Sequence, residues 1–327
     1  MTVSTPADIV LFAPTKPVIV KGLQGHNVTS ATTAAEVAAL SPDVFARTRG
    51  VGVGGLVKMD RAMFERFAKL EIVSTFGVGY DHIDVGYARE HGIIVTNTPD
   101  VLTEETADTA LGLLLCTVRD FINAEQHVRA GKWATSPFPL SKGSMRDRTV
   151  GMVGMGRIGQ AIARRLEAMQ VPVVYHSRRQ AEGIANKYYA NLIEMARDVD
   201  VLVLITPGGA STHNMINAEV LKALGPTGIL INVARGSVVD EPALIEALKQ
   251  GTIMAAGLDV FAQEPKVPQE LIDMKNVVLF PHVGSASIFT RTAMDQLVAD
   301  NLNAWFAGKP PLTPVPETPL SIAKKMA

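Results

Sequence analysis

The stretch GMVGMGRIGQAIARR, Gly151–Arg165, decides the fold of this chain. An apolar strand-like run leads into three glycines, Gly154, Gly156 and Gly159, and small residues then open a helical pattern. A strand, glycine turn and helix in this order present free backbone N–H groups and a positive dipole end to a pyrophosphate. The turn therefore predicts dinucleotide binding, with contacts from Gly154, Met155, Gly156, Arg157, Ile158 and Gly159.

The rest of the chain repeats the strand and helix alternation that is typical of parallel sheets with crossover helices. Six strands are predicted around the turn, at TVGMVGM, VPVVYHS, VDVLVLIT, GILINVA, TIMAAGLDV and NVVLF. Four are predicted earlier, at DIVLFA, RGVGV, EIVST and IIVTN. One long helix is predicted from Thr103 to Ala130, with Gly131 as its stop. The pattern indicates an α/β protein of two doubly wound parallel-sheet lobes, Rossmann-like or flavodoxin-like, with a cleft between them.

The composition excludes several classes of protein. With 327 residues, 47% of them hydrophobic and a net charge of -1, the chain is long enough for two domains and lacks the basic surface of a nucleic-acid binder. Cys116 is the single cysteine, which excludes a disulfide framework, and no metal site is predicted. The first residues show no secretory pattern and no run reaches about 18 apolar residues, so we expect a cytoplasmic protein without membrane contact. The proline-rich segment GKPPLTPVPETP is predicted to lie extended on the surface.

The tip of the second strand, VVYHSRR, indicates which dinucleotide is bound. Proteins that bind NAD commonly carry an acid there for the ribose hydroxyls, but this chain has Ser177, Arg178 and Arg179. Arginine forks match a phosphate, and a serine hydroxyl can donate a hydrogen bond to it. The tip therefore predicts NADP(H), with a merely solvated basic turn as the alternative.

Three polar residues follow the later strands: Arg235 in INVARGSVVDE, Glu264 in GLDVFAQEP and His282 in VVLFPHVGSAS. Reduction of a 2-oxo acid needs a cation for the carboxylate and carbonyl, and arginine suits both. It also needs a general acid for the new alkoxide, and a histidine oriented by a carboxylate provides one. Each residue has a structural alternative: Arg235 at a helix end, Glu264 in a surface turn and His282 as a satisfied structural histidine.

These motifs, together with STFGVGYDHID, resemble the D-isomer-specific 2-hydroxyacid dehydrogenases from about Leu70 to Met294. The resemblance implies catalytic roles for Arg235, Glu264 and His282. It also implies a discontinuous substrate-binding domain, 1–101 plus 288–327, around a dinucleotide-binding domain, 102–287. A homodimer is implied as well, with the long helix and the loop after Trp133 at its interface.

Further site residues follow from the resemblance alone. The backbone N–H groups of Val78 and Gly79 are implied to bind the substrate carboxylate, with a plain tight turn as the alternative. The loop at Val53 and Gly54 would close the other side of the pocket, whose wall would include Leu56. The implied contacts to the rest of the cofactor are Thr206, Pro207, Val233, Ala234, Asp259 and Gly284. Asp259 has an alternative role as a brace of the sheet.

Within the family, the Ser-Arg-Arg tip and the helix after the glycine turn resemble NADPH-dependent glyoxylate and hydroxypyruvate reductases. We therefore expect reduction of one of these small 2-oxo acids to the D-2-hydroxy acid, with His282 as the proton donor. Reductases of larger 2-oxo acids, such as 2-ketogluconate, hydroxyphenylpyruvate or phenylpyruvate, share many of these features. A dinucleotide-sensing binding protein of the same fold is the alternative from a different class.

Overall fold

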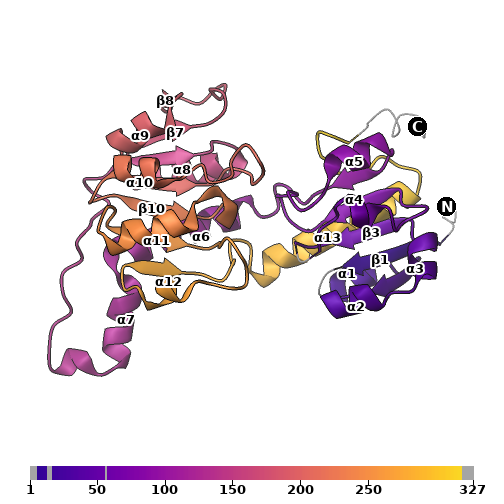
Figure 1. Cartoon of the computed structure of the whole chain (residues 1–327), viewed down its shortest axis with the longest axis horizontal. Coiled ribbons are helices and arrows are strands. Elements are labelled where there is room, and N and C mark those ends of the chain that lie inside the picture. The colour runs from indigo at the N-terminus through magenta and orange to yellow at the C-terminus, as the bar shows by residue number, and fades with distance from the viewer. Residues whose placement is uncertain (1–5, 13–16, 56, 319–327) are drawn as a thin grey trace. The chain divides into compact units, whose positions relative to one another are not determined.

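The structure is a computed structural model that describes residues 6–12, 17–55 and 57–318. The chain forms two compact units (Figure 1): unit 1 comprises Met1–Leu102 and Ser287–Ala327, and unit 2 comprises Thr103–Ala286. Each unit is built around one parallel sheet, which confirms the predicted fold class. Leu56, expected in the pocket wall, lies outside the described residues.

The sheet of unit 1 has the strand order β2-β1-β3-β4-β5, which is the flavodoxin-like arrangement. Its strands are β1 (Asp8–Phe12), β2 (Asn27–Ser30), β3 (Gly50–Val53), β4 (Ile72–Thr75) and β5 (Ile94–Thr96). Its helices are α1 (Pro17–Gly22), α2 (Ala34–Ala39), α3 (Pro42–Arg47), α4 (Arg61–Phe64), α5 (Val85–Glu90) and α13 (Ile288–Phe306). Although α13 comes last in the sequence, it packs on α1 and on the sheet of this unit, where Val298, Leu302 and Trp305 are buried.

The sheet of unit 2 has the order β12-β11-β10-β9-β6-β7-β8. Its strands are β6 (Val150–Val153), β7 (Val173–His176), β8 (Tyr188–Tyr189), β9 (Val201–Leu204), β10 (Ile229–Asn232), β11 (Ala255–Leu258) and β12 (Val277–Leu279). Its helices are α6 (Thr103–Arg119), α7 (Phe121–Arg129), α8 (Arg157–Ala168), α9 (Leu192–Asp198), α10 (Ala218–Leu224), α11 (Glu241–Lys249) and α12 (Gln269–Asp273). The chain reverses direction across the sheet between β6 and β9, and this switch point is where doubly wound sheets bind ligands.

Both faces of the unit 2 sheet are buried, as expected for parallel strands with helices on both sides. Along β9, Val201 and Val203 enter one core and Leu202 and Leu204 enter the other. This alternation reflects the two-residue period of a strand. Apart from β8, the strands of this sheet could be read from the sequence because each is an almost continuous apolar run.

The predicted long helix from Thr103 to Ala130 is wrong, because the chain breaks it into α6 and α7. Asp120 has a left-handed backbone (φ 56), which a right-handed helix cannot continue through. Asn123 donates a hydrogen bond to Asp120 Oδ1 at 2.6 Å and holds the break. The predicted stop is confirmed, since α7 ends at Arg129 and Gly131 is left-handed (φ 70).

Two edge strands and the docking of the C-terminal segment were not predicted. The strands β2 (NVTS) and β8 (YY) are short and only partly buried, so they lack the apolar run that marks a central strand. The proline-rich segment does not lie simply on the surface, because its Val315 is 2% exposed. The Val315 N–H donates to Val95 O at 2.9 Å, and Pro314 forms an antiparallel bridge with Thr96. The segment therefore covers the edge of β5.

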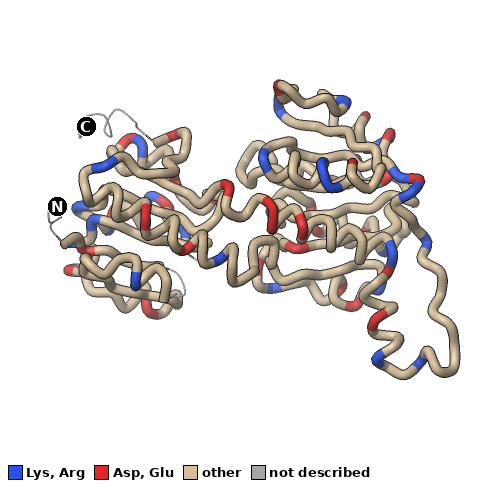
Figure 2. The backbone as a smooth tube through the Cα atoms, turned by 180° about the vertical axis from the view of Figure 1, so that it is seen from behind, with Lys and Arg blue, Asp and Glu red and all other residues tan. Residues whose placement is uncertain are grey.

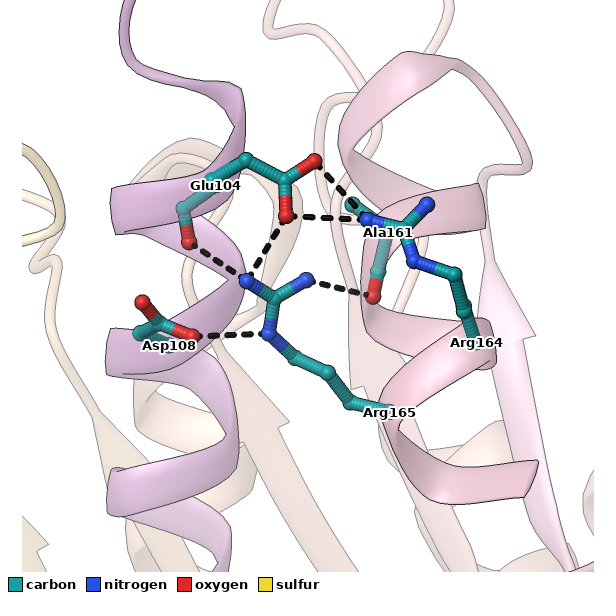
Figure 3. A network of polar contacts seen from close by, with 5 residues as sticks. All are labelled: Glu104, Asp108, Ala161, Arg164 and Arg165. Carbon is teal, nitrogen blue, oxygen red and sulfur yellow. Dashed lines mark hydrogen bonds and ion pairs between the residues drawn. The ribbon is translucent and has the colours of Figure 1, made fainter. Parts of the chain in front are cut away.

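A polar network attaches α8, the helix after the glycine turn, to α6 (Figure 3). The Arg165 guanidinium contacts Asp108 Oδ1 at 2.7 Å and Glu104 Oε2 at 2.8 Å, and it donates to Ala161 O at 2.9 Å. Arg164 donates to both carboxylate oxygens of Glu104. Hydrogen bonds from Arg165 and Arg164 hold the pKa of Glu104 below its usual range. The network fixes α8 against the first turns of α6.

Figure 2 shows acidic and basic residues interspersed over both units. Within the described residues, no helix combines the length and the apolar character that crossing a membrane requires. Among the residues that the structure describes, no group of three or more His, Cys, Asp or Glu side chains could hold a metal ion.

Candidate active site

The glycine turn lies at the switch point of unit 2, between β6 and α8. Gly154 has φ 108, and a Cβ there would lie 3.0 Å from Ile205 O, the carbonyl that follows β9. At Gly159 a Cβ would lie 2.5 Å from Gly154 O, so any larger residue would push the helix off the strand. Both glycines are therefore required by contacts within the chain.

Gly156 differs from its two neighbours in the motif. Its φ is -74, and a Cβ there would meet nothing within 4 Å among the described residues. It caps α8 without a side-chain hydrogen bond, at the helix end whose first N–H groups have no partner within the helix. The absent side chain opens this end of the helix toward an anion, so the turn fits a pyrophosphate.

The residues between the glycines differ in how much of their side chains a ligand could reach. Met155 is buried in the core of unit 2, which leaves only its backbone for a ligand. Ile158 packs against the same core, whereas Arg157 is exposed.

The tip of β7 presents two arginines to solvent. Arg178 and Arg179 are exposed, and neither has an ion-pair partner within the described part of the chain. The Ser177 hydroxyl donates to Arg179 O at 2.6 Å. Tyr188 in turn donates to Ser177 O at 3.1 Å. Ser177 thus shapes the turn, and the two guanidinium groups carry the positive charge.

The remaining predicted cofactor contacts follow β9, β10 and β11. After β9, Thr206 is partly accessible and Pro207 is exposed, whereas Val233 and Ala234 are buried after β10. Asp259 is 1% exposed after β11, and its carboxylate accepts hydrogen bonds from Val283 N at 2.7 Å and Gly284 N at 2.9 Å. Burial raises the pKa of Asp259, although these N–H groups and His282 act against the rise. These two bonds hold the loop that contains His282 against the carboxyl end of β11.

Arg235 follows β10 in an extended conformation and is half-buried. Asn232, the last residue of β10, donates to Arg235 O at 3.0 Å and accepts from Ala234 N at 3.0 Å. Gly236 lies directly against the turn after β11, where a Cβ would come within 1.9 Å of the Phe261 carbonyl. Asn232 was missed by the sequence reasoning, because a polar residue that ends an apolar strand is not distinctive.

Glu264 and His282 form a hydrogen-bonded pair. His282 Nδ1 lies 2.7 Å from Glu264 Oε2, and the side chains remain 48% and 34% exposed, respectively. Glu264 Oε1 accepts from Phe261 N at 3.1 Å, so both carboxylate oxygens are engaged. His282 has a left-handed backbone (φ 54), and its N–H donates to Asp259 O at 2.9 Å. An uncommon backbone held by neighbouring hydrogen bonds is typical of functional sites.

Five influences decide the charge of Glu264. Its partial burial favours the neutral acid, but the hydrogen bond and charge of His282 outweigh this effect, with help from Phe261 N–H and the charge of Arg235. The pKa of Glu264 therefore lies below its usual value of 4.5. The carboxylate is ionised at neutral pH, and it accepts a hydrogen bond from the Nδ1–H of the imidazole. Nε2 is the remaining nitrogen for an external group.

The predicted substrate residues of unit 1 lie at the carboxyl ends of two paired strands. Val53 ends β3 opposite Thr75 of β4, and Gly54 follows it. Phe76 N donates to Val53 O at 2.8 Å, which extends this pairing toward Val78 and Gly79. Among the described residues, neither the Val78 nor the Gly79 N–H donates a hydrogen bond.

Comparison with known proteins gives one family. Residues 111–284 match the model of the D-isomer specific 2-hydroxyacid dehydrogenase, NAD binding domain. Glyoxylate/hydroxypyruvate reductase A of Arabidopsis thaliana is 48% identical over 78% of this chain and 82% of its own length. Hydroxyphenylpyruvate reductase of Plectranthus scutellarioides is 46% identical with the same coverage of both chains.

A solved structure is similar over nearly the whole length. The NADPH-dependent glyoxylate/hydroxypyruvate reductase of Sinorhizobium meliloti, in complex with NADP and malonate, superposes with a TM-score of 0.92. The two chains are 51% identical, and the match covers 97% of this chain and 98% of the other.

Proposed function

Because this chain belongs to the D-isomer specific 2-hydroxyacid dehydrogenases, we propose that it reduces glyoxylate or hydroxypyruvate to the D-2-hydroxy acid with NADPH. The observation that carries the proposal is the 2.7 Å hydrogen bond between His282 Nδ1 and Glu264 Oε2. This pair lies in unit 2, the unit that contains the glycine turn and Arg235.

Three features support NADP(H) as the cofactor. The glycine turn fits a pyrophosphate, since Gly156 leaves the end of α8 open. Arg178 and Arg179 offer two exposed guanidinium groups for a 2′-phosphate, on the turn shaped by Ser177. The similar Sinorhizobium meliloti enzyme is NADPH-dependent and was solved with NADP. The other proposed contacts are Thr206, Pro207, Val233, Ala234, Asp259 and Gly284.

NADPH, when bound, supplies the hydride for C2 of the 2-oxo acid. Arg235 binds the substrate carboxylate and polarises the carbonyl through its guanidinium. His282 donates the proton from Nε2 to the carbonyl oxygen as that oxygen gains charge. Glu264 holds the imidazole at Nδ1, which leaves Nε2 as the nitrogen that can give its proton to the substrate. After the transfer, His282 is neutral and takes up a proton from solvent.

We assign the substrate carboxylate a second set of donors in unit 1, the N–H groups of Val78 and Gly79. Their lack of partners among the described residues supports this role. Val53 and Gly54 are proposed to line the substrate site at the end of the adjacent strand β3. Residues 1–101 and 288–327 thus form the proposed substrate-binding domain, and residues 102–287 the dinucleotide-binding domain.

A homodimer is also proposed. Within the described chain, α7 buries none of its residues, although Phe121 and Val128 are apolar. Trp133 and Leu140 on the following loop are 69% and 95% exposed. Exposed apolar side chains in this number are typical of an interface. Light scattering on the purified protein checks the dimer, and cell fractionation checks the predicted cytoplasmic location.

The test of the proposed function measures NADPH and NADH oxidation with glyoxylate, hydroxypyruvate, pyruvate, 2-ketogluconate, phenylpyruvate and hydroxyphenylpyruvate. The last compound is included because a relative that is 46% identical is named for it. We expect the highest kcat/KM with NADPH and one of the first two acids. A higher kcat/KM with hydroxyphenylpyruvate would replace the substrate assignment, and a preference for NADH would refute the cofactor assignment.

A further inference from the structure

We propose that Asn97 and Thr98 are positioning residues that aim the backbone N–H groups of Val78 and Gly79 at the substrate carboxylate. The inference rests on the proposed function, because that function assigns the carboxylate to these two N–H groups. All of the observations that support it lie within unit 1.

The segment after β4 adopts a backbone conformation that residues other than glycine rarely adopt. Gly77 has φ 138, a region that L-residues rarely enter, and this bend turns the chain toward Val78 and Gly79. The bend is held on both sides of Gly77, because Gly77 N donates to Thr98 Oγ1 at 2.9 Å and Gly77 O accepts from Thr98 N at 2.9 Å.

The direction of each N–H follows from the carbonyl that shares its peptide plane. In a trans peptide, the C=O of one residue and the N–H of the next point in opposite directions. The bond from Thr98 N to Gly77 O therefore sets the direction of the Val78 N–H. In the same way, Asn97 Nδ2 donates to Val78 O at 2.9 Å and sets the direction of the Gly79 N–H. Two consecutive residues thus fix two consecutive peptide planes.

Asn97 and Thr98 are buried, and they contact the loop on the side of its carbonyl groups. Asn97 is 9% exposed and Thr98 is fully buried. Their hydrogen bonds reach the carbonyl side of the two peptide planes, so the N–H groups face away from them. Hydrogen bonds shielded from water hold their geometry more firmly than exposed ones. The two residues therefore orient the donors without touching the substrate themselves.

Asn97 is in turn held by the segment that follows α13. Thr313 Oγ1 donates to Asn97 O at 2.6 Å, and Asn97 N donates to Thr313 O at 3.2 Å. Asn301 is fully buried on α13 and forms two hydrogen bonds with Thr313. Asn301 Nδ2 donates to Thr313 Oγ1 at 2.9 Å, and Thr313 N donates to Asn301 Oδ1 at 3.0 Å. A continuous chain of hydrogen bonds thus runs from α13 through Thr313 and Asn97 to the Val78–Gly79 peptide.

The central variant is Asn97→Ala, which removes the donor to Val78 O. We expect the KM for glyoxylate to rise about 5- to 30-fold, the effect of losing one well-shielded hydrogen bond. The KM for NADPH and kcat should change by less than about twofold, since the cofactor and proton-transfer residues lie in unit 2. Asn97→Asp should raise the KM for glyoxylate further, because a carboxylate oxygen would face the Val78 carbonyl.

Two further variants separate positioning from general damage. Thr313→Val keeps the shape but loses the hydroxyl that bonds Asn97 O, and we expect a rise of about 2- to 5-fold in the same KM. Asn276→Ala is the matched control. Asn276 Nδ2 also donates to a backbone carbonyl, Met254 O at 3.1 Å, but it lies in unit 2 outside the proposed site. This control should leave every kinetic constant unchanged.

Binding of oxamate, an unreactive glyoxylate analogue, to the NADP-loaded protein is measured by calorimetry beside the kinetics. If the wild type binds oxamate but reduces no 2-oxo acid, the proposed function fails, while weaker oxamate binding by Asn97→Ala still supports the inference. An unchanged KM and oxamate affinity in Asn97→Ala would overturn it, as would a wild type that does not bind oxamate. If Asn97→Ala does not fold, Asn97→Asp and Thr313→Val decide by the same criteria.

Discussion

The tip of β7 and the loop after β12 both follow strands of the unit 2 sheet, but they differ in how firmly their proposed functional side chains are held. Arg178 and Arg179 are exposed and have no ion-pair partner among the described residues. His282 is held at Nδ1 by Glu264, and its backbone N–H is bonded to Asp259 O. Glu264 is itself held by Phe261 N–H.

The difference corresponds to what each site is proposed to do. Recognition of a phosphate by charge tolerates some movement of long arginine side chains, since a guanidinium offers five donors. Proton transfer needs one nitrogen within hydrogen-bond distance of one oxygen, so the imidazole must be oriented beforehand. The backbone around His282 supplies this order. The comparison predicts large effects on turnover at His282 and smaller, cofactor-specific effects at the arginines.

The largest expected effect is that of His282→Ala. Loss of the general acid should lower kcat about 10²- to 10⁴-fold, the usual contribution of a positioned proton donor. NADPH affinity, measured by fluorescence titration, should remain within about twofold of the wild type. His91→Ala, at an exposed histidine of unit 1, is the control. Normal turnover in His282→Ala would remove this residue from the mechanism.

Replacement of both Arg178 and Arg179 by Ala should act on the cofactor alone. Two partly exposed charge-assisted contacts correspond to a loss of about 10- to 100-fold in kcat/KM for NADPH. The same constant measured with NADH should hardly change, because NADH lacks the 2′-phosphate. Arg197→Ala, at another exposed arginine of unit 2, serves as the control. An equal loss with both cofactors would show that the arginines stabilise the turn rather than select NADPH.

Substitutions of two glycines of the turn distinguish a glycine required by contacts within the chain from a glycine required by the ligand. Gly159→Ala would place a Cβ 2.5 Å from Gly154 O and should lower the free energy of unfolding by about 1–3 kcal/mol. Gly156→Ala meets no atom within 4 Å and should change stability by less than about 0.5 kcal/mol, yet weaken NADPH binding. Urea unfolding and cofactor titration measure the two effects. A large loss of stability in Gly156→Ala would contradict its assignment to the ligand.

The smallest expected effect concerns Glu264 and pH. Its pKa is lowered in the folded chain, so its stabilising contribution is fully present above the usual value of 4.5 and is lost as pH falls through the folded-state value. Glu264→Gln should therefore be less stable than the wild type by about 0.2–1 kcal/mol at pH 7, as for a partly exposed pair. Urea unfolding at several pH values should show this difference shrinking below pH 4.5. A difference that stays constant down to the acid limit would mean that the carboxylate charge contributes nothing.

The sequence was sufficient where the information is local. Continuous apolar runs indicated the central strands, and the glycine spacing indicated the turn between β6 and α8. It failed at β2 and β8, because these strands are short and carry no continuous apolar run. It also failed at Asp120, because the helical periodicity continues across the residue where the backbone breaks.

The sequence by itself determined the two-sheet α/β class, the glycine turn and the basic tip at Ser177–Arg179, and it singled out Arg235, Glu264 and His282 as the candidate catalytic residues. Only the tertiary structure decided how these residues are held. It brought His282 to 2.7 Å from Glu264, used Asp259 to brace the His282 loop, and joined Asn97 to the Val78 carbonyl. The reason is physical: periodicity and glycine chemistry act between near neighbours in the chain. A hydrogen bond between residues far apart in sequence depends on distances that only the packed sheets and helices set.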